Sequence, residues 1–462
     1  MTNSTRRARV YHADLWGLRE DKYAWLDNND WKTTEWREIR PVSEFYLFTP
    51  QDANLFEQYS RYIKVTDIFP VNSVGIVTAR DSLTVRWTPE DVWTTVVNFS
   101  RMGPELAREA YKLGKDARDW KVTFAQEDLR QSGPDRCHII PLLYRPFDVR
   151  FTYYTGQSRG FLCMPRPDVM RHMATGENIA LITSRLTKGE SFRHAQVTRH
   201  ITEVICMSPK TSNNGFVFPL YLLPDGDRRD LLTTHEPSER RPNLNSDLVA
   251  ALAKAYGQEP SPEEIFRYVY AVLYAPSYRE KYAEFLRLDF PRIPFTSDPE
   301  LFKNMAELGE RLVALHLLRS PELDPPLARF RGEGDGKVIV SRKKGLRYDA
   351  AQERVYINPT QYFEGIPPEV WAYPISGYQV CHKWLKDRKD RILTLDEIRT
   401  YCRITTALSK TIEIQKETDE IYPAVEESVL AIDSGEGMPG GTGTRKIPPE
   451  GTEGSGSRGG LG

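Results

Sequence analysis

The sequence predicts an α+β protein with a mixed N-terminal region, a β-rich recognition region with long loops, a helical C-terminal region and a disordered Gly-rich tail. Three observations support this fold class. Runs of β-branched and aromatic residues, separated by Gly, Pro and Asn, extend from residue 139 to residue 222, and such runs are typical of short strands. Helix start signals recur after residue 260, and eleven of the last 28 residues are glycine.

These patterns divide the chain into four parts. Residues 1–140 alternate strand-like with helix-like stretches and are rich in Trp and Tyr. Residues 141–240 form the β-rich part, and residues 241–432 form a mainly helical part with a β insertion. Residues 433–462 are too poor in apolar side chains to offset the entropy of folding, so we expect a disordered tail.

Three helix starts in the C-terminal part share one capping pattern. Ser261, Ser297 and Thr394 each stand three residues before a Glu, which places a hydroxyl at the N-cap and a carboxylate at the third helical position. After Ser297, apolar residues recur at spacings of four and three from Leu301 to Leu315, which predicts one buried stripe. Residues 337–360 read as strand, turn and strand, a small β-hairpin.

Charge and apolar runs limit the classes of protein that fit. The 462 residues hold 63 Lys and Arg against 64 Asp and Glu, so a polyanionic partner would have to bind local basic patches. The longest uninterrupted apolar run, residues 268–275, is far shorter than the roughly 20 residues of a membrane span. The first 18 residues contain no apolar signal segment, so we expect a soluble, cytoplasmic protein without a membrane partner.

Cysteine and histidine spacing argues against a metal centre. The five cysteines are scattered and odd in number, which fits neither a disulfide framework nor a zinc knuckle. His194 and His200 are six residues apart, a spacing that suits no common zinc site. We therefore predict no metal ligands in this chain.

Motifs of known enzyme classes are incomplete. Residues 156–160 match G-x-S-x-G, the nucleophile elbow of serine hydrolases, but Pro165 and Pro167 stand where the required helix should follow. We interpret this segment as a turn that presents Ser158 and Arg159. The segment 331–338 departs from a phosphate-binding loop at both ends, and residues 324–327 lack the aromatic residue of an amino-methyltransferase motif.

A concentration of positive charge indicates nucleic-acid binding. Between residues 145 and 215 ten cations face five acids, interleaved with Tyr and His on Gly-punctuated loops. Such side chains can grip phosphates and reach base edges. The alternative is that these arginines pair with acids elsewhere in the chain. The candidate DNA-binding residues are Arg145, Arg150, Tyr153, Ser158, Arg159, Arg166, Arg185, Lys188, Arg193, His194, Arg199, Lys210, Asn213, Asn214, Lys343, Lys344 and Arg347.

The candidates divide by expected role. Four of them lie in the loop 184–195 and are our first choice for reading bases: Arg185, Lys188, Arg193 and His194. Six others suit phosphates better: Arg145, Arg150, Arg159, Arg166, Arg199 and Lys210. The turn 213–215 offers amides that could pair with adenine. Arg145 and Arg150 could instead pair with Asp148 and brace the strand.

A series of ordered motifs runs from about residue 10 to about residue 421. It includes Leu-Tyr-Arg-Pro-Phe-Asp-Val-Arg-Phe-Thr-Tyr-Tyr at 143–154, Phe-Pro-Leu-Tyr-Leu at 218–222, Asp-Phe-Pro-Arg-Ile-Pro at 289–294 and Gln-Tyr-Phe-Glu-Gly at 361–365. Together these motifs resemble the target-recognition, or specificity, region of type ISP restriction-modification enzymes.

Such enzymes join a nuclease, a helicase-like ATPase, an adenine N6-methyltransferase and a C-terminal specificity domain. The resemblance implies that this chain corresponds to the last part, with residues 11–17 near the close of the methyltransferase region. It further implies double-stranded DNA as a partner and a methyltransferase or helicase-nuclease chain acting in trans. S-adenosylmethionine, ATP and Mg would be bound only by upstream domains.

We therefore predict sequence-specific recognition of double-stranded DNA, as the specificity part of a type ISP-like restriction-modification system, with no catalysis by the isolated chain. Two alternatives stay open. One is an enzyme, either a hydrolase built on Ser158 or a methyltransferase whose cofactor site is not recognised. The other is an interaction remnant that docks on a larger chain without binding DNA.

Overall fold

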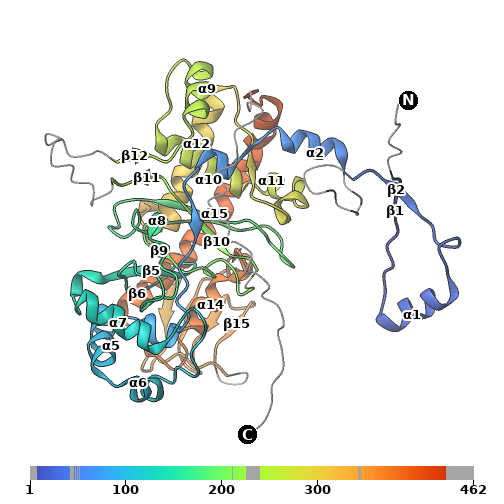
Figure 1. The fold of residues 1–462 in the computed structure, drawn as a ribbon. Helices are drawn as coiled ribbons and strands as arrows, with labels where there is room; N and C mark the ends of the chain where they lie inside the picture. The colour runs from blue at the N-terminus through green and yellow to red at the C-terminus, as the bar shows by residue number, and fades with distance from the viewer. Residues whose placement is uncertain are drawn as a thin grey trace, which may run out of the picture. The chain divides into compact units, whose positions relative to one another are not determined.

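The computed structural model describes residues 8–41, 46, 48, 50, 52–210, 212–224, 240–341 and 345–432. The chain separates into two compact units, Met1–Leu430 and Ala431–Gly462. The first unit mixes helices with several small sheets (Figure 1), so the predicted α+β class is confirmed. The predicted Gly-rich tail lies outside the described residues, and the boundaries predicted at 140 and 240 stay predictions.

The N-terminal region begins with a small paired unit. Strand β1 (Val10–His12) pairs antiparallel with β2 (Arg37–Ile39), and α1 (Arg19–Asn28) lies between them in the chain. The chain then enters the main body through α2 (Ala53–Ser60), β3 (Ile63–Lys64), α3 (Val65–Ile68) and β4 (Ser73–Val74). Strand β3 pairs with β13 (Arg292–Ile293), which ties this region to the helical part.

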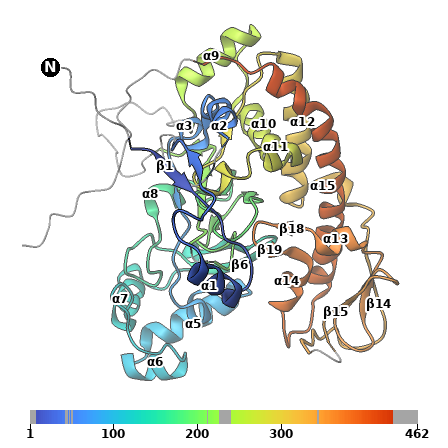
Figure 2. The same ribbon diagram turned by 90° about the vertical axis from the view of Figure 1, so that its right-hand side faces the viewer.

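Four helices cover one side of the central β structure: α4 (Asp81–Thr84), α5 (Pro89–Arg101), α6 (Pro104–Ala110) and α7 (Val122–Ser132). Thr88 caps α5 by accepting a hydrogen bond from the Asp91 N–H, and Pro89 occupies the first turn. Helices α5, α6 and α7 lie together (Figure 2). Their apolar faces pack on β5 and β6 in one hydrophobic core.

The central β structure consists of two sheets. One has the order β6-β5-β9 and contains β5 (Ile139–Arg145), β6 (Asp148–Tyr153) and β9 (Ile201–Thr202). The other has the order β4-β10-β7-β8 and contains β7 (Ala180–Ser184), β8 (Ala195–Thr198) and β10 (Gly215–Pro219). Smaller elements nearby are η1 (Arg136–His138), α8 (Pro167–Met170), β11 (Tyr221–Leu222) and β12 (Arg241–Pro242). These strands confirm the predicted β-rich part.

The helical part is built around α10 (Pro262–Tyr274), α12 (Pro299–His316) and α15 (Leu395–Glu427), which pack against one another. Capping boxes at Ser261 and Thr394 are confirmed. The predicted cap at Ser297 is wrong by one residue. Asp298 caps α12, because its carboxylate accepts hydrogen bonds from the N–H groups of Glu300 and Leu301. The region also contains α9 (Ser246–Tyr256), α11 (Pro276–Lys281) and η2 (Phe285–Arg287).

The apolar stripe of α12 is shorter than its spacing predicts. Met305, Leu312 and Leu315 are buried, whereas Leu301 and Leu308 are half-buried. Gly309 allows α12 to pack closely against α10, since a Cβ at this position would lie 1.9 Å from the backbone oxygen of Arg267 in α10. The two helices therefore approach each other backbone to backbone at this point.

A second β region follows α12 and η3 (Pro321–Leu323). Its sheet has the order β14-β17-β16-β15, with β14 (Arg329–Arg331), β15 (Arg347–Asp349), β16 (Arg354–Tyr356) and β17 (Tyr362–Glu364). The predicted hairpin is present as β15 and β16, within a larger sheet. The elements α13 (Pro368–Ala372), β18 (Pro374–Ile375), β19 (Tyr378–Gln379) and α14 (Val380–Lys386) then lead to α15.

The described residues contain neither a membrane-spanning helix nor a metal-binding cluster. No helix in the described part of the chain is both long and apolar enough to cross a membrane. Among those same residues, no group of three or more His, Cys, Asp or Glu is arranged to hold a metal ion.

Candidate nucleic-acid interface

Two loops at one end of the β7-β8-β10 sheet bring predicted DNA-binding residues together. The first loop joins β7 to β8 and carries Arg185, Lys188 and Arg193, and the second precedes β10 and carries Lys210. All four cations are exposed. Asn213 of the second loop accepts a hydrogen bond from the Lys188 N–H at 3.0 Å and donates to the Lys188 carbonyl at 3.3 Å. We call residues 185–194 and 208–214 the cationic loops.

Glu190 holds the cationic loops in one geometry. Its carboxylate accepts hydrogen bonds from His194 Nε2 at 3.1 Å, Ser208 Oγ at 2.9 Å and Asn213 Nδ2 at 3.1 Å. Burial opposes its ionisation, but these donors outweigh burial and lower the pKa of Glu190 to about 2. No local pattern indicates this role, because Glu190 is one of five acids between residues 145 and 215.

Two of the predicted contact residues lie beneath the loop surface. The side chain of His194 is 0% exposed. Burial lowers the pKa of His194, against the opposing effect of Glu190, so the neutral ring donates its Nε2–H to that carboxylate. Asn213 is also buried. In this conformation both residues shape the loops and present no surface to a ligand.

A third segment, the turn at residues 376–377 between β18 and β19, hydrogen-bonds to the backbone near the cationic loops. The N–H of Ser376 donates to the Arg193 carbonyl at 2.9 Å, and the N–H of Gly377 donates to the Met207 carbonyl at 2.9 Å. A Cβ at Gly377 would lie 2.8 Å from both carboxylate oxygens of Glu190. A side chain at this position would therefore displace the Glu190 carboxylate. The turn between β18 and β19 holds the backbone of the first cationic loop at Arg193 and that of Met207, just before the second loop.

The fold adds to this surface cations that no pattern in the sequence indicates. The Thr187 N–H donates to the Arg287 carbonyl at 3.4 Å, so the exposed Arg287 stands beside the first cationic loop. Arg185 contacts Asp289 at 3.1 Å, and Asp289 also binds Lys64 at 3.0 Å. Residues about 100 positions apart meet here, so no local pattern could have indicated them.

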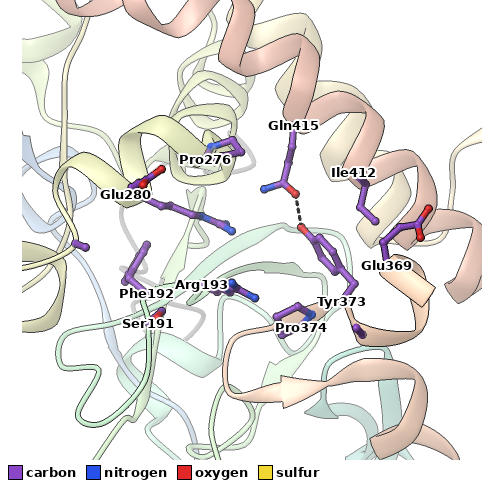
Figure 3. Close-up of a pocket in the computed structure, with 13 residues that line it drawn as sticks. Ser191, Phe192, Arg193, Pro276, Glu280, Glu369, Tyr373, Pro374, Ile412 and Gln415 are labelled. Atoms are coloured by element: carbon purple, nitrogen blue, oxygen red, sulfur yellow. Dashed lines mark hydrogen bonds between the residues drawn. The ribbon is translucent and has the colours of Figure 1, made fainter. Parts of the chain in front are cut away.

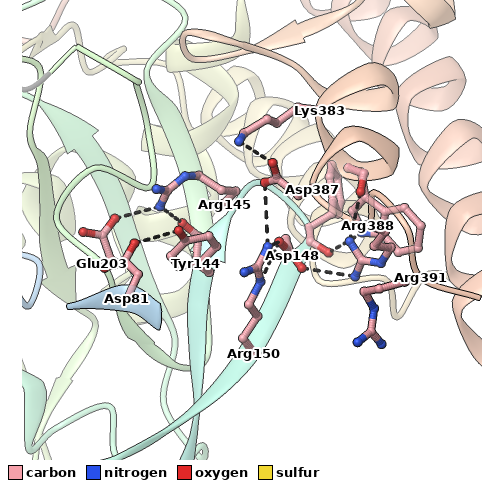
Figure 4. A network of polar contacts seen from close by, with 12 residues as sticks. Asp81, Tyr144, Arg145, Asp148, Arg150, Glu203, Lys383, Asp387, Arg388 and Arg391 are labelled. Carbon is pink, nitrogen blue, oxygen red and sulfur yellow. Dashed lines mark hydrogen bonds and ion pairs between the residues drawn. The ribbon is translucent and has the colours of Figure 1, made fainter. Parts of the chain in front are cut away.

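Arg145 and Arg150 lie in a different environment, a buried polar network (Figure 4). Arg150 binds Asp148 at 2.8 Å, as the alternative interpretation expected. Arg145 binds Glu203 at 2.8 Å, where pairing with Asp148 was expected. Asp148, whose side chain is 1% exposed, also accepts from Arg388 at 3.1 Å. The network joins β6 to the end of α14.

Aromatic rings complete this network. The guanidinium of Arg150 lies 3.9 Å from the Trp87 ring centre and 4.0 Å from that of Tyr144. Arg388 lies 3.3 Å from the centre of Trp384. Such stacking desolvates the guanidinium while retaining attraction to the ring. Arg145 and Arg150 therefore serve as internal braces and present little charge to solvent.

The remaining candidates are dispersed. Tyr153 is fully buried, and its hydroxyl donates to the Gly133 carbonyl at 3.1 Å. Ser158 and Arg159 are exposed on the predicted turn, where Arg159 pairs with Asp119 at 3.4 Å, and the next helix begins only at Pro167. Arg199 donates to the Gly176 carbonyl.

The last five candidates are half-buried, stacked on an aromatic ring or outside the described residues. Arg166 and Asn214 are half-buried, and Arg347 stacks on Tyr356 at 3.8 Å in β15. Lys343 and Lys344 lie outside the described residues. The structure thus gathers the candidates of the cationic loops and separates them from the others, whose DNA-binding roles stay predictions.

Comparison with known proteins decides the family. The family model for the type ISP C-terminal specificity domain matches residues 67–421 of this chain. The chain belongs to this family. The resemblance inferred from the motifs between residues 143 and 365 is confirmed. Among curated proteins, no significant match is found.

Solved structures share the fold of the specificity domain. The DrdV–DNA complex matches with a TM-score of 0.64 and 23% identity, over 86% of this chain and 42% of DrdV. A nuclease-deletion mutant of the type ISP enzyme LlaGI, in complex with a DNA substrate mimic, matches with a TM-score of 0.60 and 18% identity, over 90% of this chain and 33% of the LlaGI chain. The ATP-dependent type ISP enzyme LlaBIII bound to DNA matches with a TM-score of 0.61 and 17% identity, over 83% of this chain and 25% of the LlaBIII chain. The chain spans less than half the length of these proteins.

Proposed function

We propose that this specificity-domain chain recognises a target sequence in double-stranded DNA for a type ISP-like restriction-modification system. The observation that carries the proposal is the pair of cationic loops, whose exposed Arg and Lys side chains stand on a backbone fixed by Glu190. A rigid backbone matters because discrimination between bases requires donors held in place before binding. The DNA-bound structural neighbours agree with this proposal.

Within the loops, the two kinds of cation suit two tasks. Arg185 and Arg193 carry planar guanidinium groups that can donate two parallel hydrogen bonds to guanine, worth about 1–3 kcal/mol of discrimination for each good pair, or to a phosphate. Lys188 and Lys210 are point charges that suit phosphates. The Arg193 side chain forms no ion pair within the described chain, so its donors are available.

Fluorescence-anisotropy titration with a pool of duplexes at two salt concentrations tests this function. We expect binding whose affinity falls steeply with salt, because phosphate contacts release counterions. The variant Arg193→Ala should weaken binding, whereas Arg399→Ala, which removes an exposed arginine of α15, serves as the matched control. Absence of binding, or binding that salt does not weaken, would refute the proposal.

We also propose that the isolated chain performs no catalysis and that S-adenosylmethionine, ATP and Mg are bound by other domains of the system. In support, no His or carboxylate in the described chain hydrogen-bonds to the Ser158 hydroxyl. Calorimetric titration with S-adenosylmethionine should release no heat, and a fluorophosphonate probe should leave Ser158 unlabelled. Heat or labelling would favour the enzyme alternative.

A methyltransferase or helicase-nuclease chain in trans completes the proposal. Its support is the unit β1-α1-β2, in which α1 buries no residue and Trp16 and Trp31 are 82% and 71% exposed. Exposed tryptophans at this density are typical of protein interfaces. Co-purification with a methyltransferase-bearing type ISP chain should succeed for the wild type and weaken in Trp16→Ala and Trp31→Ala.

A further inference from the structure

A cleft of about 700 Å³ opens directly beside the first cationic loop (Figure 3). Four elements line it: the loop residues 191–193, α11, α13 with the start of β18, and α15. Arg193, Tyr373 and Gln415 point into it from three of these elements. Ligand sites in proteins commonly have this size, so the cleft is large enough for one nucleotide.

One wall of the cleft is cationic. Arg193 lines it and forms no side-chain ion pair within the described chain. Arg279 of α11 is held in place by the Leu273 carbonyl, which accepts from its Nε at 2.5 Å, and by the Tyr274 ring at 4.5 Å. Its buried Nη2 has no hydrogen-bond partner. Two guanidinium groups with unused donors favour an anionic group such as a phosphate.

The rest of the cleft offers different chemistry. Glu280 and Glu369 are exposed carboxylates of the lining, and carboxylates accept hydrogen bonds from exocyclic amines of bases. The Tyr373 ring is oriented by its hydroxyl, which donates to Gln415 Oε1 at 2.8 Å. Phosphate-binding, amine-binding and aromatic groups thus converge, and a nucleotide presents all three complementary groups.

We propose that this cleft binds one nucleotide that has left the base stack of the bound DNA. Its phosphate contacts Arg193 and Arg279, and its base lies against Tyr373 with its amine toward Glu369. The site is concave and bounded by four elements, so a base within the duplex cannot enter it. This inference rests on the proposed function, because the nucleotide belongs to the recognised DNA.

An acidic peptide is a poorer fit. It would satisfy the two arginines, but its carboxylates would face Glu280 and Glu369 across the same cleft. Repulsion between the peptide's carboxylates and those of the two glutamates disfavours binding of such a peptide. A nucleotide avoids this repulsion because it is anionic at one end only.

The test compares matched duplexes with duplexes that carry a single mismatch. Removing a base from the stack costs least at a mismatch, so the wild-type chain should bind mismatched duplexes about five- to twentyfold more tightly. Arg193→Ala and Glu369→Gln should abolish most of this preference. Lys188→Ala, on the same loop but outside the cleft, should weaken both duplexes equally and preserve it.

The possible outcomes separate this inference from the proposed function. Equal affinity for both kinds of duplex, or a preference that persists in Arg193→Ala, overturns the cleft site alone. Loss of binding to every duplex overturns the proposed function as well. Competition by a Glu-rich peptide that depends on Arg193 also overturns the nucleotide site, in favour of a protein ligand. Both substituted side chains are exposed, so thermal unfolding should confirm intact folds.

Discussion

The buried network around Asp148 and the cationic loops around Glu190 are both built on one carboxylate among arginines, yet they leave opposite amounts of charge available. Asp148 binds the guanidinium groups of Arg150 and Arg388, so the cations are neutralised inside the protein. Glu190 is bound mainly by neutral donors, with Lys210 Nζ 3.8 Å from its carboxylate. The neighbouring Lys188 and Arg193 therefore keep their charge for solvent or a ligand.

The difference lies in which groups neutralise the carboxylate. An arginine that pairs with a buried acid contributes to stability and is lost to binding. An acid satisfied mainly by His, Ser and Asn can organise a loop and engage only one of its cations, here Lys210. Counting cations along the sequence does not distinguish these cases.

Asp148→Ala should destabilise the fold by about 3–5 kcal/mol, because it leaves Arg150 and Arg388 buried without their shared counterion. Urea unfolding measures this loss. The control Arg399→Ala should stay within about 0.5 kcal/mol of the wild type. A similarly small effect for Asp148→Ala would mean that the two regions do not differ.

Glu190→Gln should lower the free energy of unfolding by about 1–3 kcal/mol, because it removes a charged acceptor from three hydrogen bonds. It should also change the response to acid. The folded-state pKa of about 2 lies below the ordinary value of 4.5, so ionised Glu190 stabilises the fold above pH 4.5, and this contribution disappears as the pH falls toward 2. Unfolding free energies measured across that range should therefore decline less in Glu190→Gln. Parallel declines in both proteins would contradict the proposed role.

The double variant Lys188→Ala with Arg193→Ala should weaken DNA binding. Its free energy of unfolding should stay within about 0.5 kcal/mol of the wild type. If each cation contacts a phosphate, the slope of log K against log salt should fall by about 1.8 in total, from about 0.9 per contact. Anisotropy titrations over a series of salt concentrations give the slope. An unchanged slope would place the interface elsewhere on the chain.

Ser158→Ala should produce the smallest effect. The side chain is exposed on the turn 156–160 and belongs to neither the Asp148 network nor the cationic loops. We expect unfolding free energy within about 0.5 kcal/mol of the wild type and unchanged DNA affinity. A clear loss of binding would extend the interface to the turn 156–160.

Much of the fold could be predicted because its signals are local. The capping boxes at Ser261 and Thr394 depend on residues three positions apart, and the strands β5 to β10 depend on apolar runs of a few residues. The cap at Asp298 was misplaced because Ser297 offered an equally plausible local pattern. The family resemblance was likewise available from contiguous motifs.

The candidate site could be predicted only in part. The concentration of cations between residues 145 and 215 indicated a binding surface, and the cationic loops do gather four of them. The same count included Arg145 and Arg150, which the fold buries. The roles of Glu190, Arg279 and Arg287 depend on neighbours from other elements and had no local signal.

The sequence by itself determined most of the elements, the caps at Ser261 and Thr394, the family and the chemical inventory of the loops, since each follows from residues close together in the chain. Only the tertiary structure decided which arginine meets which acid. Asp148 and Arg388 are 240 residues apart, and Arg185 and Asp289 are 104 apart. An ion pair depends on distance and burial in space, and only the folded chain fixes both.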